Sequence, residues 1–214
     1  MTVKAKICGI TTAPAIEAAV AGGAAFIGLV FFQPSPRNLR PAAAAKLIEY
    51  LPEDVTRVGL MVDPDDRLVD AVLRDVRLDM LQLHGHETPE RIEALRLEYG
   101  LPVMKALPIA GPDDVEAARI YADVADWLLF DAKPPKGASR PGGNAQAFEW
   151  SLLAGTTWPI PWMLAGGLTS ENVAQAVAAS GAGAVDVSSG VEDAPGIKNP
   201  RLIHAFLETV AKLA

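Results

Sequence analysis

The chain alternates short β-rich apolar runs with longer helical patterns, and this alternation constrains the fold more than any other feature. Eight such runs follow one another along the sequence, at intervals that suit a βα unit of about 30 residues. They span residues 3–10, 24–32, 55–62, 79–85, 102–109, 126–132, 161–167 and 184–190. Helix patterns occupy residues 14–23, 41–51, 65–75, 88–100, 113–122, 148–154, 170–181 and 201–213.

Strict alternation of this kind predicts a parallel sheet with right-handed crossovers. Eight units favour a closed TIM (β/α)8 barrel over an open doubly wound sheet. An open nucleotide-binding sheet would show G-x-G-x-x-G or G-x-x-x-x-G-K-[ST], and the sequence has neither. No change in composition divides the chain, so we expect residues 1–214 to form a single α/β domain.

Composition limits the possible partners. Half of the residues are apolar, which is enough for a sizeable core, and the net charge of −7 disfavours a nucleic-acid-binding protein. The longest uncharged apolar stretch, residues 18–32, is too short for a membrane span and contains a Gly-Gly break. The first residues, MTVKAKICG, lack the apolar core of a secretory signal. We therefore expect a cytoplasmic protein that contacts neither nucleic acid nor membrane.

Cys8 is the only cysteine, and it precedes Gly9 at the tip of the first run. One cysteine cannot form an internal disulfide, and a structural zinc site usually needs several Cys and His ligands. The histidines are His84, His86 and His204. We expect no metal site, because His84 and His86 fit a structural role better than a metal pair. The residue types alone leave Cys8 open between a core position and a reactive one.

The strand tips are the places to look for chemistry, because TIM-barrel active sites lie at the carboxyl ends of the strands. Gly-Gly follows the seventh run and Ser-Ser-Gly the eighth. Backbone N–H groups there, together with a short extra helix, form a phosphate site common in such barrels. The alternative is that these glycines form ordinary turns and that the serines are caps. Because the pattern occurs at both tips, this alternative is weaker than it would be for a single tip. The residues are Gly166, Gly167, Ser188, Ser189 and Gly190, and they predict a phosphorylated small-molecule substrate.

Three charged tip residues allow two interpretations each. Asp131 ends the buried run WLLFDAK, where burial would raise its pKa toward that of a general acid, but an ion pair with Lys133 or Lys105 is equally compatible. Arg37 lies between prolines in PSPRN and could capture a carboxylate or phosphate, or remain a solvated loop arginine. Lys105 could form a Schiff base or act as a charge partner. The Pro/Gly-rich segment 133–146 suits a mobile active-site loop.

Taken together, these tips resemble those of the phosphoribosylanthranilate isomerase family of tryptophan biosynthesis. The matching stretches cover essentially the whole chain in order. They are KICGIT (6–11), GLVFFQPSPRN (28–38), VGLMV (58–62), LQLHG (81–85), LLFDAK (128–133), GG..FEW (142–150), LAGGL..ENV (164–173) and DVSSGVE..PG.K (186–198).

The resemblance implies an Amadori rearrangement of N-(5-phosphoribosyl)anthranilate to 1-(2-carboxyphenylamino)-1-deoxyribulose 5-phosphate, without metal or organic cofactor. It assigns the general acid to Asp131 and the general base to Cys8. Cys8 would act near neutrality if its surroundings lowered the thiol pKa somewhat. The same resemblance assigns the anthranilate carboxylate to Arg37 and the phosphate to the glycines and serines of the last two tips. We expect a monomer or a homodimer.

One departure and several alternatives stand beside this assignment. The family usually has Gly-Gly-Ser/Thr-Gly-Lys where this chain has GGNAQ at residues 142–146, which puts the mechanics of that loop in doubt. Another phosphosugar barrel enzyme would be an epimerase with metal ligands or paired aspartates, or an aldolase that depends on Lys105. A barrel that binds a phosphorylated ligand without catalysis is a third possibility. Related aminoaldose phosphates could also be accepted.

Overall fold

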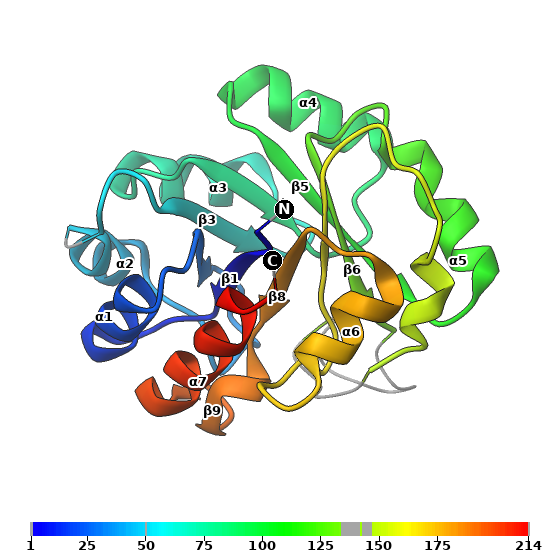
Figure 1. Cartoon of the computed structure of the whole chain (residues 1–214). Coiled ribbons are helices and arrows are strands. Elements are labelled where there is room, and N and C mark those ends of the chain that lie inside the picture. The colour runs from blue at the N-terminus through cyan, green and yellow to red at the C-terminus, as the bar shows by residue number, and fades with distance from the viewer. Residues whose placement is uncertain (1, 50, 134–141, 143–146, 214) are drawn as a thin grey trace.

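Eight parallel strands form a closed barrel in the computed structural model, which describes residues 2–49, 51–133, 142 and 147–213. Their hydrogen-bonded order follows the sequence from β1 to β8 and closes between β8 and β1 (Figure 1). The predicted TIM barrel is confirmed, and each strand is shorter than its apolar run at one end or at both ends. The strands are Lys4–Cys8 (β1), Phe26–Val30 (β2), Thr56–Met61 (β3), Met80–Leu83 (β4), Val103–Ile109 (β5), Trp127–Ala132 (β6), Trp162–Leu164 (β7) and Ala184–Val187 (β8).

Seven α-helices in the described residues surround the strands (Figure 1). They are Ala13–Ala21 (α1), Pro41–Ile48 (α2), Asp66–Asp75 (α3), Pro89–Tyr99 (α4), Pro112–Ala117 (α5), Val173–Ser180 (α6) and Pro200–Ala211 (α7). Three single turns of 3-10 helix accompany them, at Ala118–Tyr121 (η1), Trp150–Leu153 (η2) and Ser189–Val191 (η3). The helix predicted at 148–154 is therefore only a 3-10 turn, and the one at 113–122 changes from α to 3-10 at Ala118. Short connecting segments favour such turns because they can form few i→i−4 hydrogen bonds.

Helix α4 shows how local sequence sets the ends of these elements. Thr88 Oγ1 accepts a hydrogen bond from the Arg91 amide at 3.3 Å, and Pro89 occupies the first helical position. Gly100 ends the helix with a φ of 62°, a left-handed conformation that favours glycine. The two caps are the first and last residues of the helix predicted at 88–100, so the prediction is confirmed.

A small antiparallel hairpin after β8 was not predicted. It pairs Glu192–Ala194 (β9) with Ile197–Lys198 (β10) and follows η3 directly. Strands of two and three residues are too short to show an alternating pattern in the sequence. The hairpin matters because it brings the buried side chains of Glu192 and Lys198 to the carboxyl end of the barrel.

Alternation along each strand separates two sets of side chains. One set fills the barrel interior and includes Phe26, Val58, Met80, Met104, Ala106, Leu129 and Met163. The other set faces outward and forms one continuous core with the helices, which includes Ile7, Leu128, Phe130 and Phe206 of α7. The same alternation turns Lys6, Gln82, Asp131 and Asp186 inward, so polar groups occupy the interior near the carboxyl ends of the strands.

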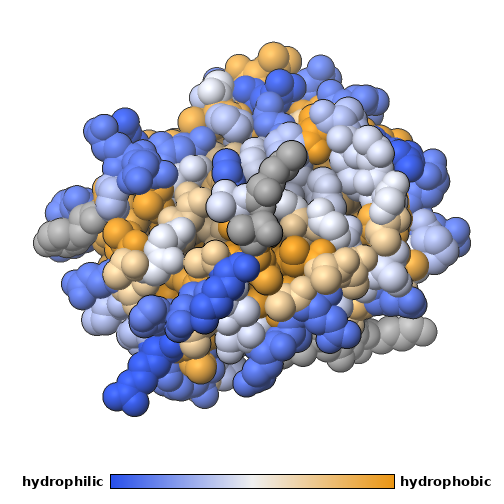
Figure 2. All heavy atoms as spheres, viewed as in Figure 1, coloured by the Kyte–Doolittle hydropathy of each residue, from blue (hydrophilic) through white to orange (hydrophobic). Residues whose placement is uncertain are grey.

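On the face shown in Figure 2, hydrophilic residues surround smaller patches of apolar residues. None of the helices in the described part of the chain combines the length and the apolar composition needed to span a bilayer.

Candidate active site

Cys8 lies at the inner end of a buried charged cluster. It ends β1, is 4% exposed and shares the inward side of the strand with Lys6, which is fully buried. Lys6 Nζ donates a hydrogen bond to Asp186 Oδ1 of β8 at 2.9 Å. A Cβ placed on Gly28 of β2 would lie 2.8 Å from Cys8 Sγ and 3.1 Å from Lys6 Nζ. The thiol and the ammonium therefore border one small space that only glycine leaves open.

The pKa values of these groups shift in ways that burial and charge explain. Burial raises the pKa of the Cys8 thiol above its ordinary value, and the charge of Lys6 lowers it, but by less. The condition that the surroundings lower this pKa is therefore not met in the structure, because removal from water outweighs the nearby cation. Burial also lowers the pKa of Lys6, yet Asp186 and Cys8 together raise it above its ordinary value. Lys6 thus remains a charged ammonium.

A chain of polar contacts connects Cys8 with Arg37. Ser188 Oγ donates to the Cys8 carbonyl at 3.1 Å, and Lys198 Nζ donates to the Ser188 carbonyl at 2.8 Å and to Glu192 Oε1 at 2.7 Å. The Glu192 carboxylate accepts Arg37 Nε and Nη2, each at 2.7 Å. Arg37 is 5% exposed, so the solvated alternative is wrong. Arg37 does hold a carboxylate, but it is one that the protein itself supplies.

This network leaves part of Arg37 available. A guanidinium has five N–H donors, and Glu192 accepts one from Nε and one from Nη2. A Cβ at Gly9, whose φ is 77°, would overlap the Arg37 side chain, so Gly9 lets the arginine pack against β1. Burial alone would raise the pKa of Glu192, but the hydrogen bond from Arg37 and the charge of Lys198 hold it below its ordinary value. Glu192 is therefore a carboxylate that fixes Arg37 in place.

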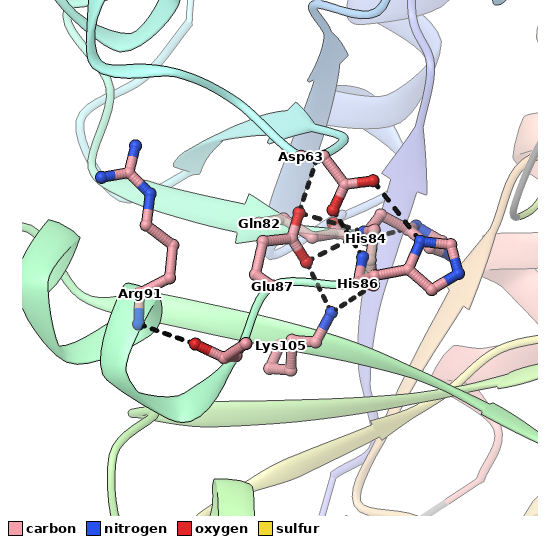
Figure 3. Close-up of polar contacts among 9 residues, drawn as sticks. Asp63, Gln82, His84, His86, Glu87, Arg91 and Lys105 are labelled. Atoms are coloured by element: carbon pink, nitrogen blue, oxygen red, sulfur yellow. Dashed lines mark hydrogen bonds and ion pairs between the residues drawn. The ribbon is translucent and has the colours of Figure 1, made fainter.

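Asp131 has a different kind of surroundings. It faces inward near the end of β6 and is 8% exposed, and its Oδ1 accepts the Ala132 amide at 2.8 Å. Its Oδ2 lies 3.3 Å from His84 Nε2, and His84 Nδ1 lies 3.4 Å from Gln82 Nε2. Gln82 and His84 share the inward side of β4 and the loop that follows it (Figure 3). An amide, an imidazole and a carboxyl group thus form a row at the barrel mouth.

The two lysines predicted as possible partners of Asp131 contact other carboxylates. Lys133 Nζ lies 3.1 Å from Asp114 Oδ1, and Lys105 Nζ donates to Glu87 Oε2 at 2.6 Å. Lys105 points outward from β5, because Met104 and Ala106 on either side of it face the interior. The ion-pair alternative for Asp131 is therefore wrong, and so is Lys105 as a Schiff-base lysine of the barrel mouth.

Glu87 organises the loops after β3 and β4 (Figure 3). Its carboxylate accepts hydrogen bonds from Lys105 and from the backbone amides of Asp63 at 2.9 Å and Gly85 at 3.0 Å. Asp63 adopts a φ of 45° and accepts the His86 amide at 2.6 Å. These contacts connect the loop after β3 with the loop that carries His84.

The two neighbouring histidines face different groups. The His86 side chain is 98% exposed and lies beside Asp63, whereas His84 turns toward Asp131. They do not form a metal pair. In the described part of the chain, no three His, Cys, Asp or Glu side chains gather in a way that could hold a metal ion.

Gly142 lies against the His84–Asp131 pair. A Cβ at this residue would be 2.7 Å from Asp131 Oδ2 and 2.8 Å from His84 Cε1. Glycine thus lets the backbone after β6 approach the acid closely. Apart from Lys133 and Gly142, the predicted active-site loop at 133–146, including the departure at Asn144-Ala145-Gln146, lies outside the described residues.

The two glycine-rich tips predicted to bind phosphate lie together. Gly166 and Gly167 have φ values of 89° and 62°, and Asn172 Nδ2 holds the Gly167 carbonyl at 2.9 Å. A Cβ on Gly190 would overlap the Leu168 carbonyl, so the loops after β7 and β8 are in contact. The predicted short extra helix corresponds to η3, whose first N–H groups, those of Ser189 and Gly190, lack intrahelical partners.

Several charged residues of the site were missed in the sequence. They are Lys6, Asp186, Glu192, Lys198 and Glu87, all nearly or fully buried. A lysine inside an apolar strand is itself a signal, since buried lysines are rare unless paired. Four of the five also lie within the stretches KICGIT and DVSSGVE..PG.K that resemble the isomerase family.

Comparisons with known proteins identify the family of this chain. The family model described as N-(5'phosphoribosyl)anthranilate (PRA) isomerase matches residues 5–209. N-(5'-phosphoribosyl)anthranilate isomerases of Paramagnetospirillum magneticum and Rhodospirillum rubrum are 64% and 60% identical, covering 97% and 96% of both chains. The Thermus thermophilus phosphoribosyl anthranilate isomerase has a TM-score of 0.84 at 36% identity, covering 99% of this chain and all of its own.

A second solved phosphoribosyl anthranilate isomerase is in complex with reduced 1-(o-carboxyphenylamino)-1-deoxyribulose 5-phosphate. Its TM-score is 0.82 at 33% identity, and the match covers 99% of this chain and all of the other.

Proposed function

The chain belongs to the N-(5'-phosphoribosyl)anthranilate isomerase family and catalyses this isomerisation in tryptophan biosynthesis, and we propose that Cys8 and Asp131 carry out its proton transfers. The observation that carries the proposal is their placement. Both face inward at the carboxyl ends of β1 and β6, with β7 and β8 between these strands in the closed barrel. Two proton-transfer groups thus approach a substrate in the mouth from different sides.

In the proposed reaction, Asp131 gives a proton to the furanose ring oxygen. The bond from that oxygen to C1 breaks, and the anthranilate nitrogen forms a double bond to C1. The Cys8 thiolate then removes the proton from C2, so that C1 and C2 become joined by a double bond and the nitrogen becomes neutral. Uptake of a proton at C1 and loss of the one on O2 give the ketone. General acids and bases placed in this way each accelerate a reaction by about 10²–10⁴-fold.

Substrate binding uses the ends of the same site. In our proposal, the N–H groups of Arg37 that Glu192 does not use hold the anthranilate carboxylate. Backbone N–H groups of the two adjacent glycine-rich tips hold the phosphate. Because the Ser188 hydroxyl already donates to the Cys8 carbonyl, Ser188 contributes its backbone. The proposed phosphate-binding residues are Gly166, Gly167, Ser188, Ser189 and Gly190.

Further aspects of the proposal concern the chain as a whole. We take residues 1–214 as one domain that works in the cytoplasm, without metal or organic cofactor. A solved relative from Thermotoga maritima is described as dimeric. Our proposal for this chain is a monomer or a homodimer.

The deciding experiment follows the loss of phosphoribosylanthranilate fluorescence with the wild type and with Cys8→Ala. We expect turnover by the wild type, and a kcat about 10²–10⁴-fold lower in the variant with an unchanged KM. Lys4→Met, which changes an exposed residue of the same strand, is the control and retains full activity. Full activity of Cys8→Ala would show that Cys8 is not the base.

A further inference from the structure

Lys6 has an unusual position for a lysine. It is fully buried inside the barrel, where bulky apolar side chains normally form the packed layers. Removing an ammonium from water is costly, and a pair with one carboxylate recovers that cost only in part. Replacement of such a pair by apolar residues often leaves stability unchanged or increases it. Closure of the barrel alone therefore gives little reason for a charge at this place.

The geometry connects this charge to Cys8. Asp186 anchors one N–H of Lys6 at 2.9 Å, and the ammonium and the Cys8 sulfur both border the space above Gly28. Lys6 and Cys8 are two residues apart on the same side of β1, so their backbone separation is fixed by the strand. An ammonium so close to a sulfur atom stabilises the thiolate over the thiol.

The other groups around Cys8 are less suited to this role. The neighbouring strand β2 presents Gly28 and Val30, which carry no charge. Lys198 also lowers the pKa of Cys8, but it is the smallest of the causes. Its ammonium is engaged by Glu192 Oε1, the Ser188 carbonyl and Ser188 Oγ at 2.7, 2.8 and 3.2 Å. Asp186, on β8, acts in the opposite direction and raises the pKa of Cys8.

We propose that Lys6, anchored by Asp186, is the positioning residue that makes Cys8 able to serve as a base, by stabilising its thiolate when the C2 proton is to be removed. This inference rests on the proposed function of Cys8. It adds that Asp186 has two effects: its charge opposes the thiolate, and its hydrogen bond holds the cation that favours it. Gly28 is part of the arrangement, because any side chain there would separate the two groups.

Because Cys8 is the only thiol of the chain, its ionisation can be measured directly. The test is the pH dependence of thiolate absorbance in the ultraviolet, with Cys8→Ala as the blank. It is done on the wild type, on Lys6→Met/Asp186→Asn and on Asp186→Asn. We expect the thiol pKa to rise by about one unit or more in the double variant, as for loss of a close opposite charge. In Asp186→Asn, which keeps the cation and removes the anion, we expect it to fall.

The activity profile provides an independent measurement. The ascending limb of kcat/KM against pH reports the ionisation of the base in the free enzyme. We expect it to move in the same direction as the thiol pKa in each folded variant, with little change in KM. Lys4→Met is the matched control, since it removes a charge from the same strand at an exposed position, and its titration stays that of the wild type.

The outcomes separate this inference from the proposed function. An unchanged thiol titration in the folded double variant overturns the role of Lys6, even if Cys8→Ala is inactive. If the double variant does not fold, Asp186→Asn decides alone: a lower thiol pKa supports the proposal, and an equal or higher one refutes it. Full activity of Cys8→Ala would instead remove the function on which the inference depends.

Discussion

The two proposed proton-transfer groups lie near the carboxyl ends of strands of the same barrel, yet the groups around them differ in kind. Cys8 lies beside the ammonium of Lys6 and the carboxylate of Asp186. The polar contacts of Asp131 within the described residues are a backbone amide and the imidazole of His84, whose ring in turn faces the Gln82 amide. A base that must become an anion thus has fixed full charges around it. An acid that must arrive protonated is oriented by hydrogen-bonding groups.

Of the changes that test this comparison, replacement of Asp131 is expected to have the largest effect. In Asp131→Asn, the side chain keeps its shape but loses the proton that opens the sugar ring. We expect kcat to fall by about 10²–10⁴-fold with KM nearly unchanged. Steady-state fluorescence kinetics measure both values, and the exposed Asp113→Asn on the same face serves as control. A variant with a normal kcat would contradict the assignment of Asp131.

Near Cys8, buried charges depend on one another for stability, whereas the groups around Asp131 do not include such pairs in the described residues. Glu192→Gln leaves Arg37 and Lys198 buried without the carboxylate that pairs with both. We expect the free energy of unfolding to fall by about 3–5 kcal/mol, as for other broken buried pairs. Urea denaturation measures it. A loss below about 1 kcal/mol, as is usual for exposed pairs, would show that the network is effectively solvated.

His84 tests how far the acid depends on orientation. His84→Asn removes the Nε2 contact with Asp131 at 3.3 Å and retains a polar side chain. A hydrogen bond between uncharged groups is worth about 0.5–1.5 kcal/mol, so we expect kcat to fall roughly twofold to tenfold. The pH profile is measured along with kcat and KM. Equal losses in Asp131→Asn and in the double variant with His84→Asn would confirm that His84 acts only through Asp131.

The pH dependence of stability tests the contribution of the charged network around Glu192. The pKa of Glu192 is depressed in the folded chain, so its contribution to stability is present above the ordinary glutamate value near 4.5 and is lost as the pH falls through the folded pKa. We expect the urea midpoint to fall with acidification, and Glu192→Gln to show a smaller fall. An equal acid dependence in both proteins would argue that other carboxyl groups dominate it.

The smallest effect concerns Gln82 on the acid side. Its Oε1 is buried without a hydrogen-bond partner in the described structure, so Gln82→Leu removes an unpaired polar atom along with one long hydrogen bond. We expect the free energy of unfolding to change by less than about 1 kcal/mol. Urea denaturation beside Glu192→Gln gives the comparison directly. A loss as large as that of Glu192→Gln would mean that the buried polar groups around Asp131 contribute as much to stability as the charged pairs do.

The sequence predicts the positions of the groups at strand ends better than their partners. The order of the strands follows from alternating patterns, and this order alone brings Cys8, Asp131 and the two glycine-rich tips to one mouth. The direction of Lys105 could not be read, because a buried strand is apolar on both sides and shows no alternation. The partner of Arg37 lies 155 residues away, in a hairpin too short to show a pattern.

Lys6 illustrates the same limit from the other side. Its presence in KICGIT is visible in the sequence. Its proposed effect on Cys8, however, depends on Asp186, 180 residues later, and on the absence of a side chain at Gly28. The direction of the thiol pKa shift could not be predicted for the same reason. Local sequence shows a cysteine beside glycine, whereas the degree of burial is a property of the closed barrel.

The burial of Cys8 also bears on the chemical durability of the enzyme. Peroxides and alkylating agents attack the thiolate rather than the thiol, and the raised pKa keeps the resting thiol largely protonated. With a single sulfhydryl group, the chain has no second cysteine that could form a disulfide with an oxidised Cys8 and so allow its repair. Burial in the barrel therefore protects the thiol that we propose as the base.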